Sequence, residues 1–232
     1  MTFASEIHHL KNVLRLKKGD KIVAFNGEGK EADGIIQSLN AGNIQVNILA
    51  VRTDPIQTLS IILACAVPKK AKFETIIEKC TELGVDHIIP LKTERTEIRL
   101  EEARLEQKLR RYRTIAINAA KQSQRKSLPA IHPFLTLQSV LREFLNSETL
   151  TFIFCLDGNR RPLKEAVKAK KSYHKRILLL IGPEGDFTRR EIDAACLAGS
   201  LAVSLGENVL KVDTAAMAVT AIIRQLLGTH PV

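Results

Sequence analysis

Apolar and polar residues alternate in short runs through the first fifty residues of the chain. Three such runs stand at Lys21–Phe25, 32–36 and 44–48. Turn-forming pairs lie between them, at Asn26-Gly27 and around Gly42, and such pairs favour tight hairpins. The pattern therefore predicts a small antiparallel barrel built from short hairpins.

The chain changes character at Asp54-Pro55, which we interpret as a linker. Beyond it, wholly apolar runs alternate with amphipathic helical stretches. Strands are expected there at 59–66, 87–91, 151–156, 176–181 and 201–205, and helices at 72–83, 101–124, from Thr188 to about Gly199 and at 214–227. A further helix, at 5–14, is expected before the hairpins of the first part. Repeated strand–helix units with apolar strands predict an α/β domain whose parallel sheet is covered on both faces.

The distribution of charge along the chain indicates the class of its binding partner. The net charge is +10, and it is concentrated in two places. Residues 92–126 hold 11 basic and 5 acidic side chains, and residues 157–176 hold 8 basic and 2 acidic ones. Clustered Lys and Arg predict a polyanionic partner such as nucleic acid, with a solvated basic face as the alternative. The chain has no Trp and few aromatic residues, which argues against recognition dominated by base stacking.

The cysteines, the histidines and the hydropathy of the chain bear on disulfides, metal sites and membrane spans. The four cysteines form no Cys-x-x-Cys pair, so free thiols are expected, three of them buried. The six histidines show no ligand spacing, and no metal site is predicted. No signal segment is recognisable, and no run approaches the roughly 20 apolar residues that a membrane span requires. We therefore expect a soluble, cytoplasmic protein.

The most specific chemistry follows the strand at 176–181. This strand leads into the loop Gly182-Pro-Glu-Gly185, and Thr188 with Glu191 forms a capping-box pattern that begins a helix. Open α/β folds bind ligands at the carboxyl edge of the sheet, and glycines there let a ligand approach the backbone. The loop is therefore a candidate cofactor site, with a tight turn that holds no ligand as the alternative.

A second loop repeats this arrangement. The strand at 201–205 leads into Gly206 and a seven-residue stretch that ends at Asp213. Asp213 or Thr214 is expected to cap the next helix, whose small apolar face from Ala215 suits close packing. For Asp213, a capping role alone is the alternative to a functional one.

These motifs carry a family resemblance. Ile181-Gly-Pro-Glu-Gly-Asp-Phe-Thr188, Leu205-Gly206 and Val209-Leu-Lys-Val-Asp-Thr-Ala215 resemble the C-terminal signature of SPOUT methyltransferases. His9-Leu-Lys-Asn-Val-Leu-Arg15 with Gly19-Asp20, Lys79-Cys-Thr-Glu-Leu-Gly84 and Ala119-Ala-Lys-Gln-Ser-Gln-Arg125 narrow the resemblance to the RsmE family, which methylates N3 of one uridine in 16S ribosomal RNA.

The resemblance implies a PUA-like RNA-binding barrel over 1–55 and a SPOUT methyltransferase domain over 56–232. It also implies a C-terminal trefoil knot that holds S-adenosylmethionine, and a homodimer formed through the knot helices. Knots are rare exceptions to the rules of chain topology, so periodicity alone does not predict one. Because the chain opens at Met1-Thr-Phe, the first barrel strand of the family is expected to be abbreviated.

The resemblance also implies the site residues. Cofactor contacts are expected at Leu156, Ile181, Gly182, Pro183, Glu184, Gly185, Leu205, Gly206, Asn208, Val209, Leu210, Thr214 and Ala215. RNA contacts are expected at His9, Lys11, Asn12, Arg15, Lys79, Gln122, Ser123 and Arg125, and along the Arg-rich helix from Arg104. The chain departs from the family at Lys211, Asp213 and Lys121, where Arg, Glu and Glu are usual. Lys cannot make the bidentate contacts of Arg.

Methylation of uridine N3 requires loss of the imide proton, and the base must leave its pair to be reached. Arg125 and Lys211 are candidates to stabilise the resulting anion or a phosphate, and either Glu184 or Asp213 is a candidate to take the proton. The alternatives are a ribose 2′-O RNA methyltransferase of the same superfamily and a non-catalytic RNA-binding assembly protein. The expected substrate is 16S ribosomal RNA within the small ribosomal subunit.

Overall fold

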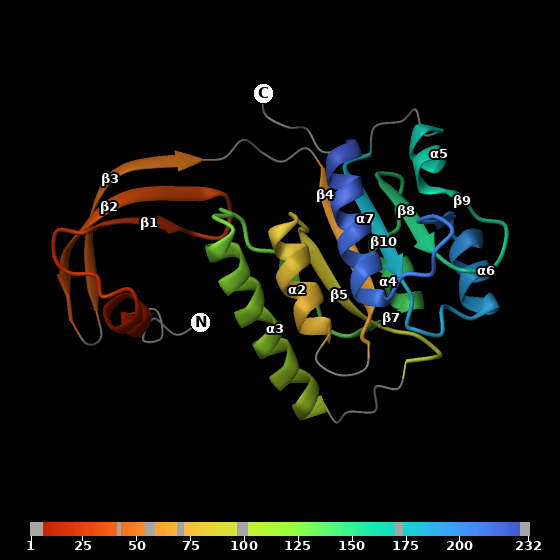
Figure 1. Cartoon of the computed structure of the whole chain (residues 1–232), viewed down its shortest axis with the longest axis horizontal. Coiled ribbons are helices and arrows are strands. Elements are labelled where there is room, and N and C mark those ends of the chain that lie inside the picture. Colours follow the sequence, from red (N-terminus) through yellow and green to blue (C-terminus); the bar gives the residue numbers. More distant parts are fainter. Residues whose placement is uncertain are drawn as a thin grey trace. The chain divides into compact units, whose positions relative to one another are not determined.

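The computed structural model describes residues 7–40, 43–53, 59–68, 72–96, 102–169 and 174–227. The chain forms two compact units (Figure 1). The first comprises Met1–Ile56 with Gln124–Leu128, and the second comprises Gln57–Ser123 with Pro129–Val232. The predicted linker Asp54-Pro55 and the opening Met1-Thr-Phe lie outside the described residues.

The first unit contains a three-stranded antiparallel sheet in the order β1-β2-β3. Its strands are β1 (Lys21–Phe25), β2 (Lys30–Leu39) and β3 (Ile44–Thr53), so the predicted hairpins are confirmed. Ile36 on β2 is fully buried and, with Ile7, supplies the apolar centre of this unit. The stretch around Ser127 joins the sheet, because Leu128 N–H donates to the carbonyl of Gly27 over 2.9 Å.

The helix predicted over 5–14 differs in type from the expectation. Over His9–Val13 it has the wider π-helical turn, labelled η1. It ends where Arg15 adopts a positive φ of 54°, a conformation that an α-helix cannot continue through. The hydrophobic pattern marked the place of this helix. It does not distinguish the two kinds of turn, since both present one apolar face.

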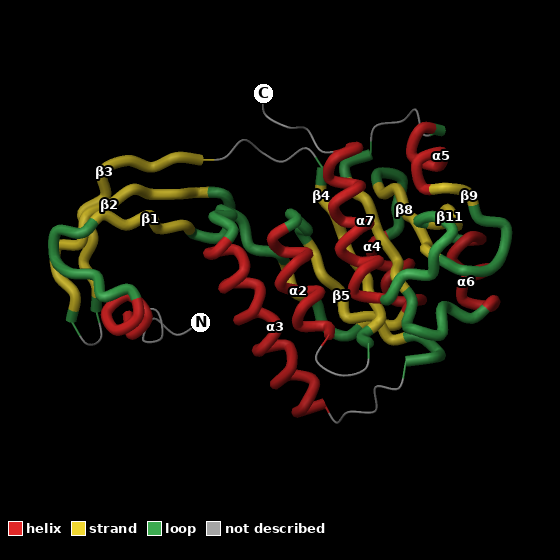
Figure 2. The backbone as a smooth tube through the Cα atoms, in the orientation of Figure 1, coloured by secondary structure: helices red, strands yellow, loops and turns green. Residues whose placement is uncertain are grey.

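The second unit is built on a parallel sheet (Figure 2). Its order is β6-β5-β4-β10-β8-β11-β9, and β7 also pairs with β5. The strands are β4 (Ser60–Ala66), β5 (His87–Lys92), β6 (Ala130–Ile131), β7 (Leu135–Thr136), β8 (Thr149–Phe154), β9 (Arg161–Pro162), β10 (Arg176–Ile181) and β11 (Leu201–Ser204). The five strands that the apolar runs predicted are confirmed, and each pairing between strands of this sheet is parallel.

Helices cover both faces of this sheet. They are α2 (Lys72–Glu82), α3 (Glu102–Gln122), α4 (Leu137–Phe144), α5 (Leu163–Lys168), α6 (Arg189–Leu197) and α7 (Val212–Leu227). Side chains alternate along β4, so that Ile61 and Leu63 pack in the core beneath α2 and α7, whereas Ile62 packs in the core beneath α4 and α6. The wholly apolar strands are thus explained by two cores, one on each face.

The cysteines and the helices bear on two further predictions from the sequence. Cys65, Cys80 and Cys155 are buried free thiols and Cys196 is an exposed one, as the spacing and the apolar contexts predicted. Among the described residues, no helix combines the length and the apolar character needed to cross a bilayer.

Candidate functional site

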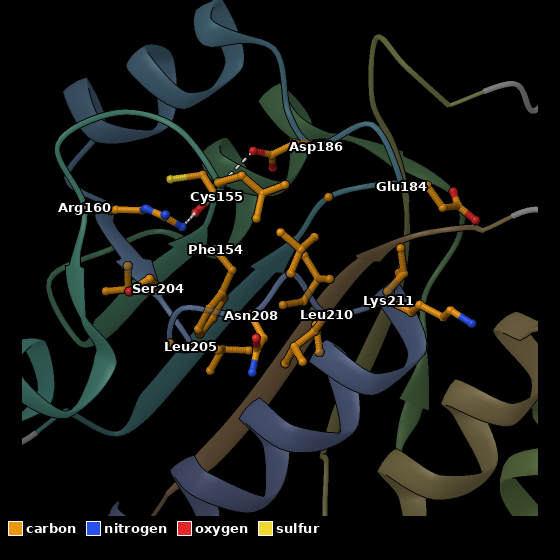
Figure 3. Close-up of a pocket in the computed structure, with 18 of the residues that line it drawn as sticks. Phe154, Cys155, Arg160, Glu184, Asp186, Ser204, Leu205, Asn208, Leu210 and Lys211 are labelled. Atoms are coloured by element: carbon orange, nitrogen blue, oxygen red, sulfur yellow. Dashed lines mark hydrogen bonds between the residues drawn. The ribbon is translucent and has the colours of Figure 1, made fainter.

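A pocket lies where three neighbouring strands of the second unit end. The last residue of β10, Ile181, pairs with Phe154 at the end of β8, and Phe154 pairs on its other side with Val203 of β11. The loops that leave these strands form the walls of the pocket (Figure 3). The site is therefore at the carboxyl edge of a parallel sheet, the place where such sheets bind ligands.

The first wall is the loop from Gly182 to Phe187. Asp186 N–H donates to the carbonyl of Pro183 over 2.9 Å, which closes a tight turn. A Cβ placed on Gly182 would lie 3.0 Å from the ring and the backbone nitrogen of Phe187, so this glycine permits a close approach of two backbone segments. The loop is therefore compact.

The predicted capping box after this loop is confirmed. Thr188 Oγ1 accepts from the N–H of Glu191 over 3.2 Å, and the Glu191 carboxylate accepts from the N–H of Thr188 over 2.8 Å. Glu191 is buried, and its other oxygen accepts from the N–H of Glu94 over 2.9 Å. Arg95, beside Glu94, donates to the carbonyl of Gly185. The segment after β5 thus supports the loop from outside.

The second wall follows β11. Gly206 has a positive φ of 130°, which a residue with a side chain rarely adopts, and the chain then passes Asn208 and Leu210 to reach α7. The prediction that Asp213 or Thr214 caps this helix is wrong. The helix begins one residue earlier, at Val212, and both residues lie in its first turn.

Three ionisable groups predicted as catalytic belong to these walls or lie next to them. Glu184 and Lys211 are exposed and line the pocket on the same side, as Figure 3 shows. Asp213 does not line the pocket, and its Oδ1 is buried without a hydrogen-bond partner in the described part of the chain. Burial raises the pKa of the Cys65 thiol well above its ordinary value, and the charges of Cys80, Asp213 and Glu184 raise it further.

Most of the predicted cofactor contacts meet in this pocket. It is lined by Leu156, Ile181, Gly182, Pro183, Glu184, Leu205, Gly206, Asn208, Val209, Leu210 and Ala215. Gly185 and Thr214 do not line it. Sequence reasoning missed Phe154, Cys155, Arg160, Asp186, Val203, Ser204 and Val212. A signal for several of them was available, because Phe154, Cys155, Val203 and Ser204 lie near the carboxyl ends of two expected strands, 151–156 and 201–205, and parallel strands end at the same edge of a sheet.

The predicted RNA contacts are divided between the two units. In the first unit, Lys11 and Arg15 are exposed, and Asn12 Nδ2 lies 2.8 Å from His8 Nδ1. The side chain of His9 lies outside the described part of the chain. Arg125 also belongs to the first unit, where its Nε donates to Ser127 Oγ over 3.3 Å. The catalytic role predicted for Arg125 therefore stays a prediction.

In the second unit, Lys79 and Gln122 line a common groove between α2 and α3. The ammonium of Lys79 contacts Glu78 at 2.8 Å and Glu82 at 2.9 Å, and these carboxylates raise its pKa. Ser123 Oγ donates to the carbonyl of Ala119 over 2.7 Å. The hydroxyl of Ser123 therefore forms its hydrogen bond to the backbone at the end of α3.

Comparison with known proteins connects this geometry to a family. Residues 55–224 match the family described as "RNA methyltransferase domain", and residues 4–49 match the one described as "RNA methyltransferase PUA domain". Ribosomal RNA small subunit methyltransferase E of Synechocystis is 34% identical over 96% of this chain and 72% of its own length. The chain belongs to the ribosomal RNA small subunit methyltransferase E family. The Bacillus subtilis member is 26% identical over 90% of this chain and 83% of its own length.

Solved structures of the family have the same fold. The Neisseria gonorrhoeae enzyme bound to S-adenosyl methionine has a TM-score of 0.86 and 28% identity, and the match covers 97% of this chain and 90% of that one. A putative methyltransferase from Legionella pneumophila, in complex with the cofactor SAM, has the same score and identity over 98% and 91%. The predicted family and its architecture, a parallel α/β domain with a small N-terminal antiparallel domain, are confirmed.

Proposed function

We propose that this chain methylates ribosomal RNA of the small subunit with S-adenosylmethionine as methyl donor. The observation that carries the proposal is the pocket at the shared end of β8, β10 and β11, in a chain whose solved relatives bind this cofactor. The net charge of +10 supports a polyanionic substrate.

The residues of the pocket fit the proposed cofactor. Leu156, Leu205 and Leu210 offer apolar contacts to an adenine ring, and the absence of side chains at Gly182 and Gly206 leaves backbone groups accessible for hydrogen bonds. The carboxylate of Glu184 suits the positive charges of the methionine part and the sulfonium. When bound, the cofactor supplies a methyl group activated by this sulfonium.

The side chains at the pocket have distinct parts in the proposed reaction. Lys211 places a cation at the exposed rim, where it stabilises a negatively charged base or a phosphate. Between the two candidates for accepting the imide proton we favour Glu184, because this residue lines the pocket whereas Asp213 does not. The walls orient the donor and exclude water from it.

The exact acceptor atom, the natural substrate, the cellular location, the knot and the oligomeric state are inferred from the family resemblance. We infer that the acceptor is N3 of one uridine in 16S ribosomal RNA, that the assembled small subunit is the natural substrate, and that the protein works in the cytoplasm. We further infer a trefoil knot around the cofactor loops and a homodimer through the knot helices. The division into a PUA-like domain over 1–55 and a SPOUT domain over 56–232 is likewise our proposal, and the two family matches on either side of residue 55 support it.

One set of measurements tests the proposal. Calorimetry should detect binding of S-adenosylmethionine to the purified chain. Mass spectrometry of 16S ribosomal RNA from cells lacking the gene should show one uridine without its N3 methyl group, and a plasmid copy should restore it. Glu184→Gln should lower the turnover rate by about 10²-fold, which is the lower range for loss of a general base.

Each alternative has its own signature in the same measurements. A methyl group lost from a ribose 2′-oxygen would identify the related 2′-O methyltransferase activity. RNA binding without cofactor binding would identify a non-catalytic assembly protein. Unchanged 16S ribosomal RNA in the deletion strain would overturn the proposed substrate.

A further inference from the structure

The peptide group between Cys155 and Leu156 is held by two side chains of opposite charge. Its carbonyl oxygen accepts a hydrogen bond from Nη1 of Arg160 over 3.0 Å. Its N–H donates to Oδ2 of Asp186 over 2.7 Å. The guanidinium thus meets the negative end of the peptide dipole, and the carboxylate meets the positive end. Figure 3 shows both contacts beside the pocket.

This peptide lies where the sheet stops supporting the chain. Strand β8 ends at Phe154, whose pairing with Ile181 is the last one between β8 and β10. Cys155 N–H still reaches the carbonyl of Val203 on β11 over 3.3 Å. The next N–H, that of Leu156, is bonded by a side chain from the loop after β10. Asp186 therefore continues, by its carboxylate, the link between two strands that their backbones no longer pair.

The backbone of Asp186 shows that this contact has a steric cost. Asp186 has a positive φ of 62°, a left-handed conformation that is unfavourable for most L-residues and that Asp and Asn tolerate better than most. Its second carboxylate oxygen accepts from the N–H of Phe187 over 2.8 Å. A glycine would adopt this φ without penalty, but it would leave the N–H of Leu156 without this partner.

Both clamping residues and the clamped residue line the cofactor pocket. Arg160 and Leu156 come from the loop after β8, and Asp186 comes from the loop after β10. Arg160 holds the carbonyl of the peptide group within its own loop, and the bond from the Leu156 N–H to Asp186 joins the two loops. Charge-assisted hydrogen bonds are about twice as strong as neutral ones, so the pair fixes the wall better than loop packing would.

We propose that Asp186 and Arg160 are positioning residues for S-adenosylmethionine, and that they act by holding the Cys155–Leu156 peptide against the loop after β10. The inference rests on the proposed function. The two side chains hold the pocket wall in the shape that binds the cofactor, and the methyl transfer itself does not require them.

The test compares three variants by calorimetry with S-adenosylmethionine. Asp186→Gly removes the bridge and keeps the backbone conformation accessible, so affinity should fall about tenfold, as expected when one charge-assisted hydrogen bond is lost. Asp186→Asn keeps an oxygen acceptor and tolerates the same φ, so it should bind within about threefold of the wild type. Asp157→Asn removes an exposed carboxylate from the same loop as Leu156 and should leave affinity unchanged.

Two further readouts separate positioning from general stability. The KM for S-adenosylmethionine should rise in Asp186→Gly, while the turnover rate at saturating cofactor changes less than about twofold. The reason is that the variant weakens cofactor binding equally in the ground state and in the transition state. Hydrogen exchange at the Leu156 amide should become faster in cofactor-free Asp186→Gly, and exchange within β4 should stay as in the wild type. Because Arg160→Met acts on the same peptide, its effect on affinity should not add to that of Asp186→Gly.

The possible failures are distinguishable. A wild-type chain that does not bind S-adenosylmethionine would overturn the proposed function. A wild-type chain that binds it, with Asp186→Gly equally tight, would overturn this inference alone. Asp186→Asn as weak as Asp186→Gly would also overturn it, because the effect would then come from charge and not from the bridge.

Discussion

Arg224 in the last turns of α7 forms an ion pair of 2.9 Å with Asp86, the residue before β5. The same oxygen of Asp86 accepts from the N–H of Ile61 on β4 over 2.9 Å, and Arg224 also donates to the carbonyls of Leu59 and Gly84. The two charged side chains are only 21% and 18% exposed. The end of the last helix is therefore fastened to the amino ends of two central strands, opposite the pocket.

Replacing Arg224 by Met should lower the free energy of unfolding by about 2 kcal/mol, because Asp86 is left partly buried without its counter-charge. Urea denaturation measures this change. Lys175→Met is the matched control, since its pair with Glu148 is 64% and 53% exposed and such pairs contribute at most about 1 kcal/mol. Equal losses in the two variants would contradict the special role of the Arg224 pair.

A histidine pair makes stability depend on pH. Nδ1 of His87 lies 3.0 Å from Nε2 of His132. Burial lowers the pKa of both rings below the ordinary value of 6.5. The charge of Arg176 lowers the pKa of His87 further, and the charge of His87 lowers that of His132. Asp86 raises the pKa of His87 and Glu143 raises that of His132, but the net shift of each ring is downward. The unfolded chain therefore binds protons at higher pH than the folded chain, so this stability is complete above about pH 6.5 and lost as the pH falls through the folded pKa values.

Thermal denaturation between pH 7.5 and 5 measures this effect. The wild type should lose more stability on acidification than the double variant His87→Gln/His132→Gln, which keeps every carboxylate of the wild type. Parallel pH profiles for the two proteins would show that the pair is not the group responsible. The difference between the profiles is the quantity to compare, because it removes the contribution of all other ionisable groups.

The long strands and helices were predictable because each has a clear period. After their first residues, Ser60 and Arg176, β4 and β10 are wholly apolar because they are buried on both faces, and α2 shows one apolar stripe. The two-residue strands such as β9 were missed, because two residues cannot show a period. Helices α4 and α5 were also missed. They span only 8 and 6 residues, too short for the repeated spacing on which a prediction depends.

The site was predictable where glycines mark the loops and unpredictable where contacts cross the sheet. Gly182 and Gly206 identified two walls of the pocket. Nothing in the spacing of Arg160 and Asp186 connects them, because the structure joins them through the peptide group between Cys155 and Leu156. The error at Asp213 is of another kind, since a carboxylate in the first turn of a helix and one at its cap have almost the same sequence signature.

Cysteine reactivity should follow burial. Burial raises the pKa of all four thiols, that of Cys80 to about 12, that of Cys155 to about 11 and that of Cys65 well above its ordinary value, but only Cys196 is exposed. Iodoacetamide should therefore modify Cys196 first in the native protein and all four thiols in denaturant, as peptide mass spectrometry would show. Modification of Cys65 as fast as Cys196 in the native protein would contradict the packing of β4.

The two glycines of the first loop should differ in their tolerance of a methyl group. A Cβ on Gly182 would lie 3.0 Å from the backbone nitrogen and ring of Phe187, so Gly182→Ala must displace the loop and should cost about 1–3 kcal/mol of stability, as overpacking does. A Cβ on Gly185 meets only Cδ of Arg95, at an ordinary 3.5 Å, so Gly185→Ala should change stability by less than about 1 kcal/mol. Urea denaturation measures both variants, and calorimetry should show weaker cofactor binding in Gly182→Ala because this loop is a wall of the pocket. If Gly182→Ala were as stable as the wild type and bound the cofactor equally well, the close approach of Gly182 and Phe187 could not be what shapes the pocket.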